Sequence, residues 1–222
     1  MSLISAASGK DSGKPGEAAK QRRQRRSSIL YLDLVIFKVN LPRYVLDQDY
    51  SRDPVLAQAL TYWRAIRRAR AMPSRRDIDP TEIGQLLPHL QLIDVVDGGA
   101  RYRYRLAGTS LVMAFGREYT GKYLDELFAG ERLAYALRVF ATVCSRQRPV
   151  FLRNRYSTTR DVDMMANRLY MPLSEDGRSV NVIFGALTFE FGHGALAGLW
   201  SGATLDRSTA TLHVIEDEVI LA

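Results

Sequence analysis

The order of hydrophobic patterns along the chain predicts an α+β domain: a five-stranded antiparallel sheet with helices on one face, preceded by an amphipathic N-terminal helix. Two alternating strand patterns come first, followed by short helical segments and one longer helical pattern. Three further strand patterns complete the series, all within about 110 residues. Strands that follow one another without an intervening helix favour antiparallel pairing, and the helices then cover a face of the sheet.

The 222-residue chain has 46% hydrophobic residues, enough to bury a substantial core in one domain with tails. Its net charge of +7 is concentrated at the N-terminus, where residues 1–28 hold seven Lys and Arg against two acidic residues. The overall basicity therefore says little about what the folded part binds. A single cysteine, Cys144, excludes an intramolecular disulfide and a Cys-rich zinc site and favours a reducing cytosol.

Composition divides the chain into three parts. Residues 1–50 are predicted to be a disordered basic tail and linker, residues 51–191 the domain with its flanking helix, and residues 192–222 a C-terminal extension. The basic run Gln21–Arg26 could contact nucleic acid or an anionic membrane surface, or be only a solvated arm. The apolar stretch Ile29–Val39 is too short to span a bilayer, and it contains an aspartate.

The flanking helix is expected from Pro54 to about Ala71. Asp53 is a good N-cap, and proline suits the first helical position because its missing N–H has no partner there. Apolar residues then recur every three to four positions. The resulting stripe consists of Leu56, Leu60, Trp63 and Ile66. We expect this stripe either to form a dimer seam or to pack on the domain's own sheet.

A second helix start follows at Asp79–Glu82, where an N-cap, a proline and an acidic residue form a capping box; this helix must end before Pro88. Strands are predicted at Leu90–Val96 and Arg101–Ala107, joined by a glycine-rich turn. The second strand alternates strictly, with tyrosines and a leucine on one side and three arginines on the other.

The remaining elements follow from the same patterns. Helices are expected at Ser110–Phe115, Leu124–Phe128 and Glu131–Arg146. Strands are expected at Val150–Ser157, Met164–Leu173 and Val180–Phe191, the last two joined by the turn Ser174–Gly177. Beyond them, Ala210–Ile215 and Val219–Leu221 could form a small hairpin.

Six short motifs occur in a familiar order. They are Asp77-Ile78-Asp79-Pro80, Leu86-Leu87-Pro88-His89, Tyr104-Arg105-Leu106-Ala107-Gly108-Thr109, Phe115-Gly116-Arg117-Glu118-Tyr119-Thr120-Gly121, Leu124-Asp125-Glu126-Leu127-Phe128 and Pro172-Leu173-Ser174-Glu175-Asp176-Gly177. Over residues 53–191 the chain resembles a family of stand-alone bacterial PAS domains of the alphaproteobacterial type. The resemblance implies a sensory or protein-interaction module that holds a small ligand or cofactor between sheet and helices and dimerises through flanking helices.

A ligand pocket in such a domain would be lined from several elements. The candidate ligand-binding residues are Tyr104, Leu106, Leu111, Phe115, Leu137, Phe140, Leu152, Met165, Leu169 and Ile183. Tyr104 would supply a polar group in an apolar wall, as is typical of ligand sites. The same residues could instead form a closed core.

The sequence disfavours haem and a photo-reactive flavin and predicts no metal site. The expected helix 131–146 contains no histidine to ligate iron, and His89 fits a structural role beside a proline. His193 and His213 lack a metal-binding spacing. Cys144 lies on the apolar face of its helix, where a thiol is usually inert.

The sequence therefore predicts a cytoplasmic single-domain PAS sensor or adaptor without catalytic residues. It would act as a homodimer and by contact with an unidentified signalling protein, with a possible small-molecule ligand. One alternative is a nucleic-acid or membrane-surface binder that uses the basic tail and the arginines of the second strand. Another is a small enzyme on the same fold, which would need a buried carboxylate or histidine that the candidate pocket lacks.

Overall fold

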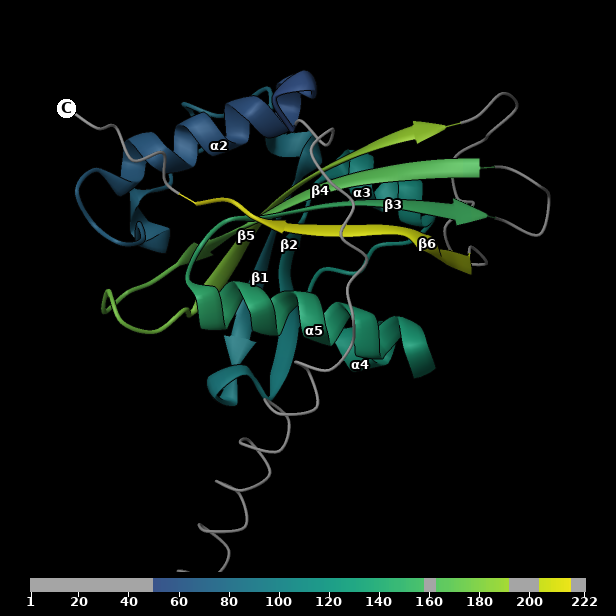
Figure 1. The fold of residues 1–222 in the computed structure, drawn as a ribbon. Coiled ribbons are helices and arrows are strands. Elements are labelled where there is room, and N and C mark those ends of the chain that lie inside the picture. The colour runs from purple at the N-terminus through teal and green to yellow at the C-terminus, as the bar shows by residue number, and fades with distance from the viewer. Residues whose placement is uncertain (1–49, 158–162, 192–203, 217–222) are drawn as a thin grey trace, which may run out of the picture. The chain divides into compact units, whose positions relative to one another are not determined.

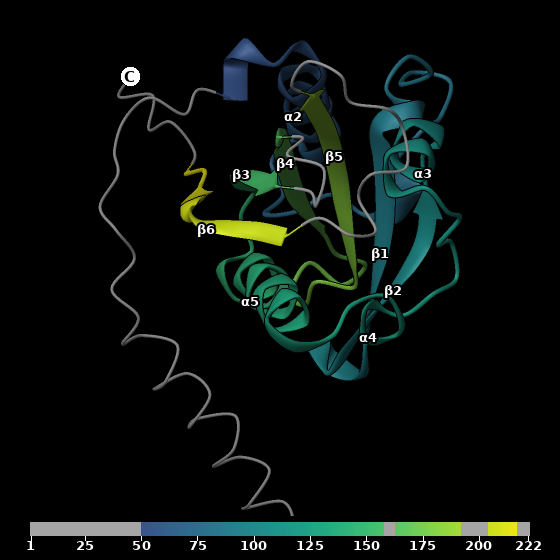
Figure 2. The ribbon, with the colours of Figure 1, turned by 90° about the vertical axis from the view of Figure 1, so that its right-hand side faces the viewer.

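The computed structural model describes residues 50–157, 163–191 and 204–216. These residues form a six-stranded antiparallel sheet in the order β2-β1-β5-β4-β3-β6, with helices against both of its faces (Figures 1 and 2). Strands β1 to β6 span Leu90–Val96, Arg101–Ala107, Val150–Ser157, Asp163–Leu173, Val182–Phe191 and Thr204–Val214. Helices α2 to α5 span Pro54–Arg67, Thr109–Phe115, Leu124–Leu127 and Gly130–Arg146. The predicted α+β class is confirmed.

The sheet has six strands rather than five, because β6 pairs antiparallel with β3 along its length. The sequence pattern predicts a small hairpin here, but its first arm is part of this longer strand; the second arm, Val219–Leu221, lies outside the described residues. Without β6, the backbone groups of β3 on this side would lack strand partners. Pairing with a further strand satisfies them.

Helix α2 begins where the sequence predicts and ends earlier. The Asp53 carboxylate accepts hydrogen bonds from the backbone N–H groups of Val55 and Leu56, at 3.1 and 3.2 Å. The helix ends at Arg67 rather than near Ala71, because the next residue has a φ of 55°. The Arg70 guanidinium then donates to the Ile66 carbonyl at 2.7 Å and satisfies a group at the helix end.

The short helix predicted to start at Asp79 and to end before Pro88 does not form. Residues 80–86 are a series of turns, followed by a single 3-10 turn at Leu87–His89. The Asp79 carboxylate is held by its own local turn, where it accepts from the Thr81 N–H at 2.8 Å. Gly108, which precedes α3, packs closely here: a Cβ on it would overlap the Leu87 and Pro88 carbonyl oxygens.

The two faces of the sheet carry two separate cores. On the α2 face, α2 packs against β4 and β5. On the opposite, cavity face, α5 packs against β4 and α4 against β2, and α3 belongs to the same core (Figure 1). Successive strand residues point to opposite faces. In β4, Leu169 therefore belongs to the α2 face, whereas Arg168 and Tyr170 point toward α5.

The apolar stripe of α2 is buried within the chain itself. Leu56, Leu60 and Trp63 are at most 2% exposed and pack on the α2 face of the sheet, while Ile66 lies partly buried at its margin. The Trp63 indole N–H also donates to the Pro172 carbonyl at 2.9 Å. Of the two expectations for this stripe, the structure shows packing on the sheet, which leaves Leu56, Leu60 and Trp63 almost no exposed surface for a dimer seam.

Candidate functional site

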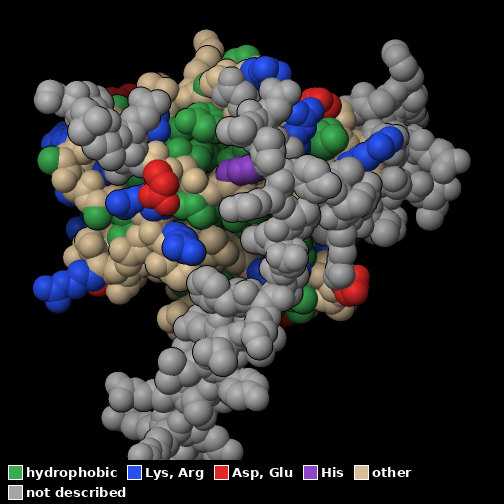
Figure 3. Space-filling view, in the orientation of Figure 1, with side chains coloured by type: hydrophobic (Ala, Val, Ile, Leu, Met, Phe, Trp, Pro, Cys, Tyr) green, Lys and Arg blue, Asp and Glu red, His purple; other side chains and the backbone are tan. Residues whose placement is uncertain are grey.

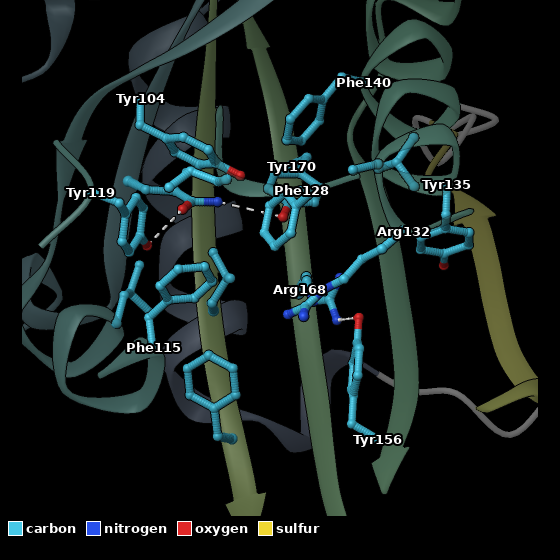
Figure 4. Close-up of a pocket in the computed structure, with 17 residues that line it drawn as sticks. Tyr104, Phe115, Tyr119, Phe128, Arg132, Tyr135, Phe140, Tyr156, Arg168 and Tyr170 are labelled. Carbon is cyan, nitrogen blue, oxygen red and sulfur yellow. Dashed lines mark hydrogen bonds between the residues drawn. The ribbon is translucent and has the colours of Figure 1, made fainter. Parts of the chain in front are cut away.

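A cavity of about 70 Å³ lies between the sheet and helices α3 to α5 (Figure 4). Nine of its lining residues are aromatic, five are aliphatic and three are Gln91, Arg132 and Arg168. The aromatic residues are Tyr104, Phe115, Tyr119, Phe128, Tyr135, Phe140, Tyr156, Tyr170 and Phe189. The aliphatic residues are Leu111, Leu127, Ala136, Val139 and Leu187. The site thus has the composition of a ligand pocket, an apolar wall with a few polar groups.

Edge-on ring contacts shape the aromatic wall. The ring centroids of Tyr104 and Tyr119 lie 4.9 Å apart in a T-shaped arrangement, and those of Phe140 and Tyr170 lie 5.2 Å apart at 90°. Phe115 contacts both Tyr119 and Phe128. Such pairs favour fixed geometries. They connect α3, α4, α5 and the sheet around the cavity.

Gln91 organises the polar groups at the base of the cavity. Its amide oxygen accepts a hydrogen bond from the Tyr119 hydroxyl at 3.2 Å, and its amide nitrogen donates to the Tyr170 hydroxyl at 3.4 Å. Gly185 lies between Gln91 and Tyr170 in the sheet register. A Cβ on Gly185 would come within 2.8 Å of the Gln91 Cγ atom. The glycine therefore leaves the space in which these two side chains meet.

Two arginines bring positive charge to the cavity. Arg168, in the middle of β4, is 8% exposed and donates a hydrogen bond to the Tyr156 hydroxyl. Arg132 extends from α5 with its guanidinium 4.7 Å from the Phe128 ring centroid. Both side chains lie on the same side of the cavity in Figure 4. Burial lowers the pKa of Arg132, and the nearby charge of Arg168 lowers this pKa further.

Four tyrosines of the cavity are hydroxyl donors at neutral pH. Burial raises the pKa of Tyr104, Tyr119 and Tyr135 above its usual value, and raises that of Tyr170 to about 12. Each phenol therefore keeps its proton. Together with the guanidinium groups, they give the site more hydrogen-bond donors than acceptors. The described lining residues include no aspartate, glutamate, histidine or cysteine.

Four of the ten candidate ligand-binding residues line the cavity. They are Tyr104, Leu111, Phe115 and Phe140. Leu152 and Ile183 are buried in the same core without reaching the cavity, and the half-buried Leu137 packs against that core.

The other three lie elsewhere, for reasons of strand geometry. Met165 and Leu169 lie an odd number of positions from Arg168 in β4. Because successive strand residues point to opposite faces, both are directed to the α2 face. Leu106 is 39% exposed, because the register of β1 and β2 shifts just before it. Such an irregularity breaks the alternation that places Tyr104 inside.

Arg132 and Arg168 bring charge to the cavity, but neither is among the ten residues predicted from the sequence. Arg168 interrupts an otherwise largely apolar strand, and an arginine there is a signal of a buried polar site. Arg132 carries no comparable signal, because a charged residue in the first turn of a helix normally faces solvent. Its position is evident only from the packing of α5.

The remaining candidate groups lie outside the cavity. The Cys144 sulfur lies 3.9 Å from the Tyr102 hydroxyl, and burial raises the pKa of the thiol to about 11. No cluster of three or more histidine, cysteine or acidic side chains suited to a metal occurs among the described residues. Within the same residues, no helix combines the length and apolar character needed to cross a bilayer.

The arginines of β2 form ion pairs with carboxylates. Arg103 and Arg105 both reach Asp94, at 2.8 and 2.6 Å. Arg101 pairs with Asp125 at 2.7 Å. On the face shown in Figure 3, the described basic side chains are interspersed with acidic ones. These contacts give the alternative of nucleic-acid binding by β2 no support; the basic tail lies outside the described residues.

The PAS domain family matches residues 52–188. Among solved structures, the chain is similar to the Rhodobacter sphaeroides LOV protein, with 14% identity and a TM-score of 0.37, over 53% of this chain and 71% of that one. A comparison with curated proteins finds no match.

Proposed function

Because the chain belongs to the PAS domain family, we propose that it is a bacterial cytoplasmic sensor that binds a small ligand in the cavity. It then signals by dimerisation or by contact with another protein. The observation that carries this proposal is the cavity between sheet and helices, with Gln91, Arg132 and Arg168 in an aromatic wall. The single cysteine is in keeping with a reducing compartment.

The packing of the cavity supports ligand binding over a closed core. Protein interiors are close-packed, and voids larger than a water molecule are few. A space of about 70 Å³ is wide enough for water or a small molecule. Its polar groups are already oriented by contacts such as those of Gln91 with Tyr119 and Tyr170, so a ligand would meet a largely preformed site.

The sheet offers a route from the cavity to α2. Strands β4 and β5 hold cavity residues on one face and contact α2 on the other. The Thr188 hydroxyl donates to the Asp53 carboxylate at the start of α2, and Trp63 bonds to the Pro172 carbonyl. A shift of Arg168 or Tyr170 on ligand binding would therefore reach α2 through two rigid strands. We place the partner contact outside the buried stripe of α2.

Native mass spectrometry tests this proposal directly. Protein purified from a bacterial host is compared with its denatured mass. We expect a reproducible excess mass that is lost on denaturation, together with a dimer signal. A bare monomer, which also shows no stabilisation by any member of a metabolite panel, would refute ligand sensing by this cavity.

The route to α2 has a separate test. Trp63 reports on α2 by fluorescence once Trp200 is replaced by phenylalanine. Ligand addition should change the Trp63 emission in this variant. Unchanged emission in the presence of a saturating ligand would refute transmission through the sheet while leaving ligand binding intact.

A further inference from the structure

We propose that the cavity recognises a short-chain organic carboxylate, held by Arg132 and Arg168. This inference rests on the proposed ligand-sensing function and assigns the chemical class of the ligand. Three features of the cavity lead to it: the sign of its charge, the geometry of its donors and its volume.

The charge of the site favours an anion. Arginine stays protonated in proteins, so both guanidinium groups are positive at neutral pH. The described lining residues add no carboxylate. An anion bound beside Arg132 and Arg168 can accept charge-assisted hydrogen bonds from both guanidinium groups, which are stronger than those that a neutral ligand accepts.

The geometry of the donors favours a carboxylate over a spherical or tetrahedral anion. A guanidinium presents parallel N–H groups that match the two oxygens of a carboxylate. The opposite side of the cavity is aromatic, with Tyr104 and Phe115 facing across from the arginines in Figure 4. A ligand that places an anionic end at the arginines and a hydrocarbon end at this wall meets both requirements. Phosphate has no apolar part to contact the wall.

The volume sets the length of the hydrocarbon part. The cavity holds about 70 Å³, less than half of the roughly 150 Å³ apolar cavity that admits benzene. This favours acids of about two to four carbons over aromatic acids. For so few atoms, ligand efficiency limits the expected Kd to the micromolar range or weaker.

The decisive experiment titrates the full 222-residue chain with propionate and with propionamide, its neutral counterpart of nearly the same shape. Binding is followed by two-dimensional NMR, including the arginine Nε–H signals, in a buffer free of carboxylate and phosphate. We expect propionate to bind at least about tenfold more tightly than propionamide, since charge-assisted hydrogen bonds are about twice as strong as neutral ones.

Matched variants on one helix locate the site. Arg132→Gln should weaken propionate binding about tenfold or more. Arg132→Lys should weaken it less, because lysine keeps the positive charge although it lacks the parallel N–H donors of the guanidinium. Arg138→Gln is the control, since Arg138 is exposed on the same helix and does not line the cavity; its affinity should stay within about twofold. Circular dichroism checks that each variant folds.

The outcomes separate this inference from the proposed function. Equal binding of propionate and propionamide, phosphate binding as tight as propionate, or an unchanged affinity in Arg132→Gln would each overturn the carboxylate assignment. If propionate and related short acids do not bind but native mass spectrometry finds another bound molecule, the assignment fails and ligand sensing stands. If no molecule binds in either experiment, both fail.

Discussion

The two faces of the sheet differ in character although the same strands build them. On the α2 face, Leu60, Trp63 and their neighbours fill a closed core of mainly aliphatic side chains. On the cavity face, aromatic rings leave a space beside Arg132 and Arg168. The α2 face has the packing expected of a stabilising core, whereas the cavity face retains buried charge that a purely stabilising core would exclude. One face of the sheet therefore stabilises the fold, whereas the other carries the proposed ligand site.

The largest expected effect comes from breaking the α2 face. Trp63→Ala should lower the free energy of unfolding by about 3–5 kcal/mol, because it removes a fully buried ring and its hydrogen bond to Pro172. Phe128→Ala on the cavity face should cost only about 1–2 kcal/mol, since its ring is half-buried beside an existing space. Urea unfolding of both variants measures the difference. Equal losses would contradict the comparison.

Adding a methyl group, rather than removing a side chain, tests how tightly the cavity face is packed. Gly185→Ala should cost about 1–3 kcal/mol, because its Cβ would press on Gln91 and the Tyr170 ring. Gly84→Ala is the matched control, since a Cβ there meets no atom within 4 Å. The control should change stability by less than about 0.5 kcal/mol. A neutral Gly185→Ala would mean that the base of the cavity adapts freely.

Removing a charge from the cavity should leave the ligand-free protein no less stable. We expect Arg132→Gln to raise the free energy of unfolding by up to about 1 kcal/mol, because it removes the cost of burying a charged group while losing the contact with Phe128. Thermal unfolding without ligand measures this, with Arg138→Gln as the control. A loss above about 1 kcal/mol would show that Arg132 serves stability rather than recognition.

The smallest effect concerns the hairpin that joins β4 and β5, the strands shared by the two faces. The Asp176 carboxylate accepts hydrogen bonds from the backbone of Ser179 and Arg178 and from the Ser174 hydroxyl, which lowers its pKa to about 2. Its contribution is therefore complete above the unfolded pKa of about 3.9 and is lost as the pH falls toward 2. Melting temperatures of Asp176→Asn between pH 5 and 2 should fall less steeply than those of the parent, with Glu175→Gln as the control.

The sequence pattern does not determine which residues of β4 face the cavity. Residues 164–173 are largely apolar at both odd and even positions, because both faces of the sheet are covered. Alternation alone therefore does not say whether Leu169 or Tyr170 faces the helices that line the cavity. Only the pairing with β5, which aligns Tyr170 with Gly185 and Gln91, decides the phase.

Local sequence patterns are sufficient to predict the class of the fold, the bounds of β1, β2 and β3 and the start of α2. These depend on interactions within a few residues, such as the Asp53 cap and strict alternation in β2, that are legible in the chain order. Only the tertiary structure sets the pairing of β6 with β3, the close approach at Gly185 and the position of Arg132 and Arg168 at one cavity. Those contacts join segments that are distant in sequence, and their free energy depends on packing and on the charge of neighbours that no local pattern records.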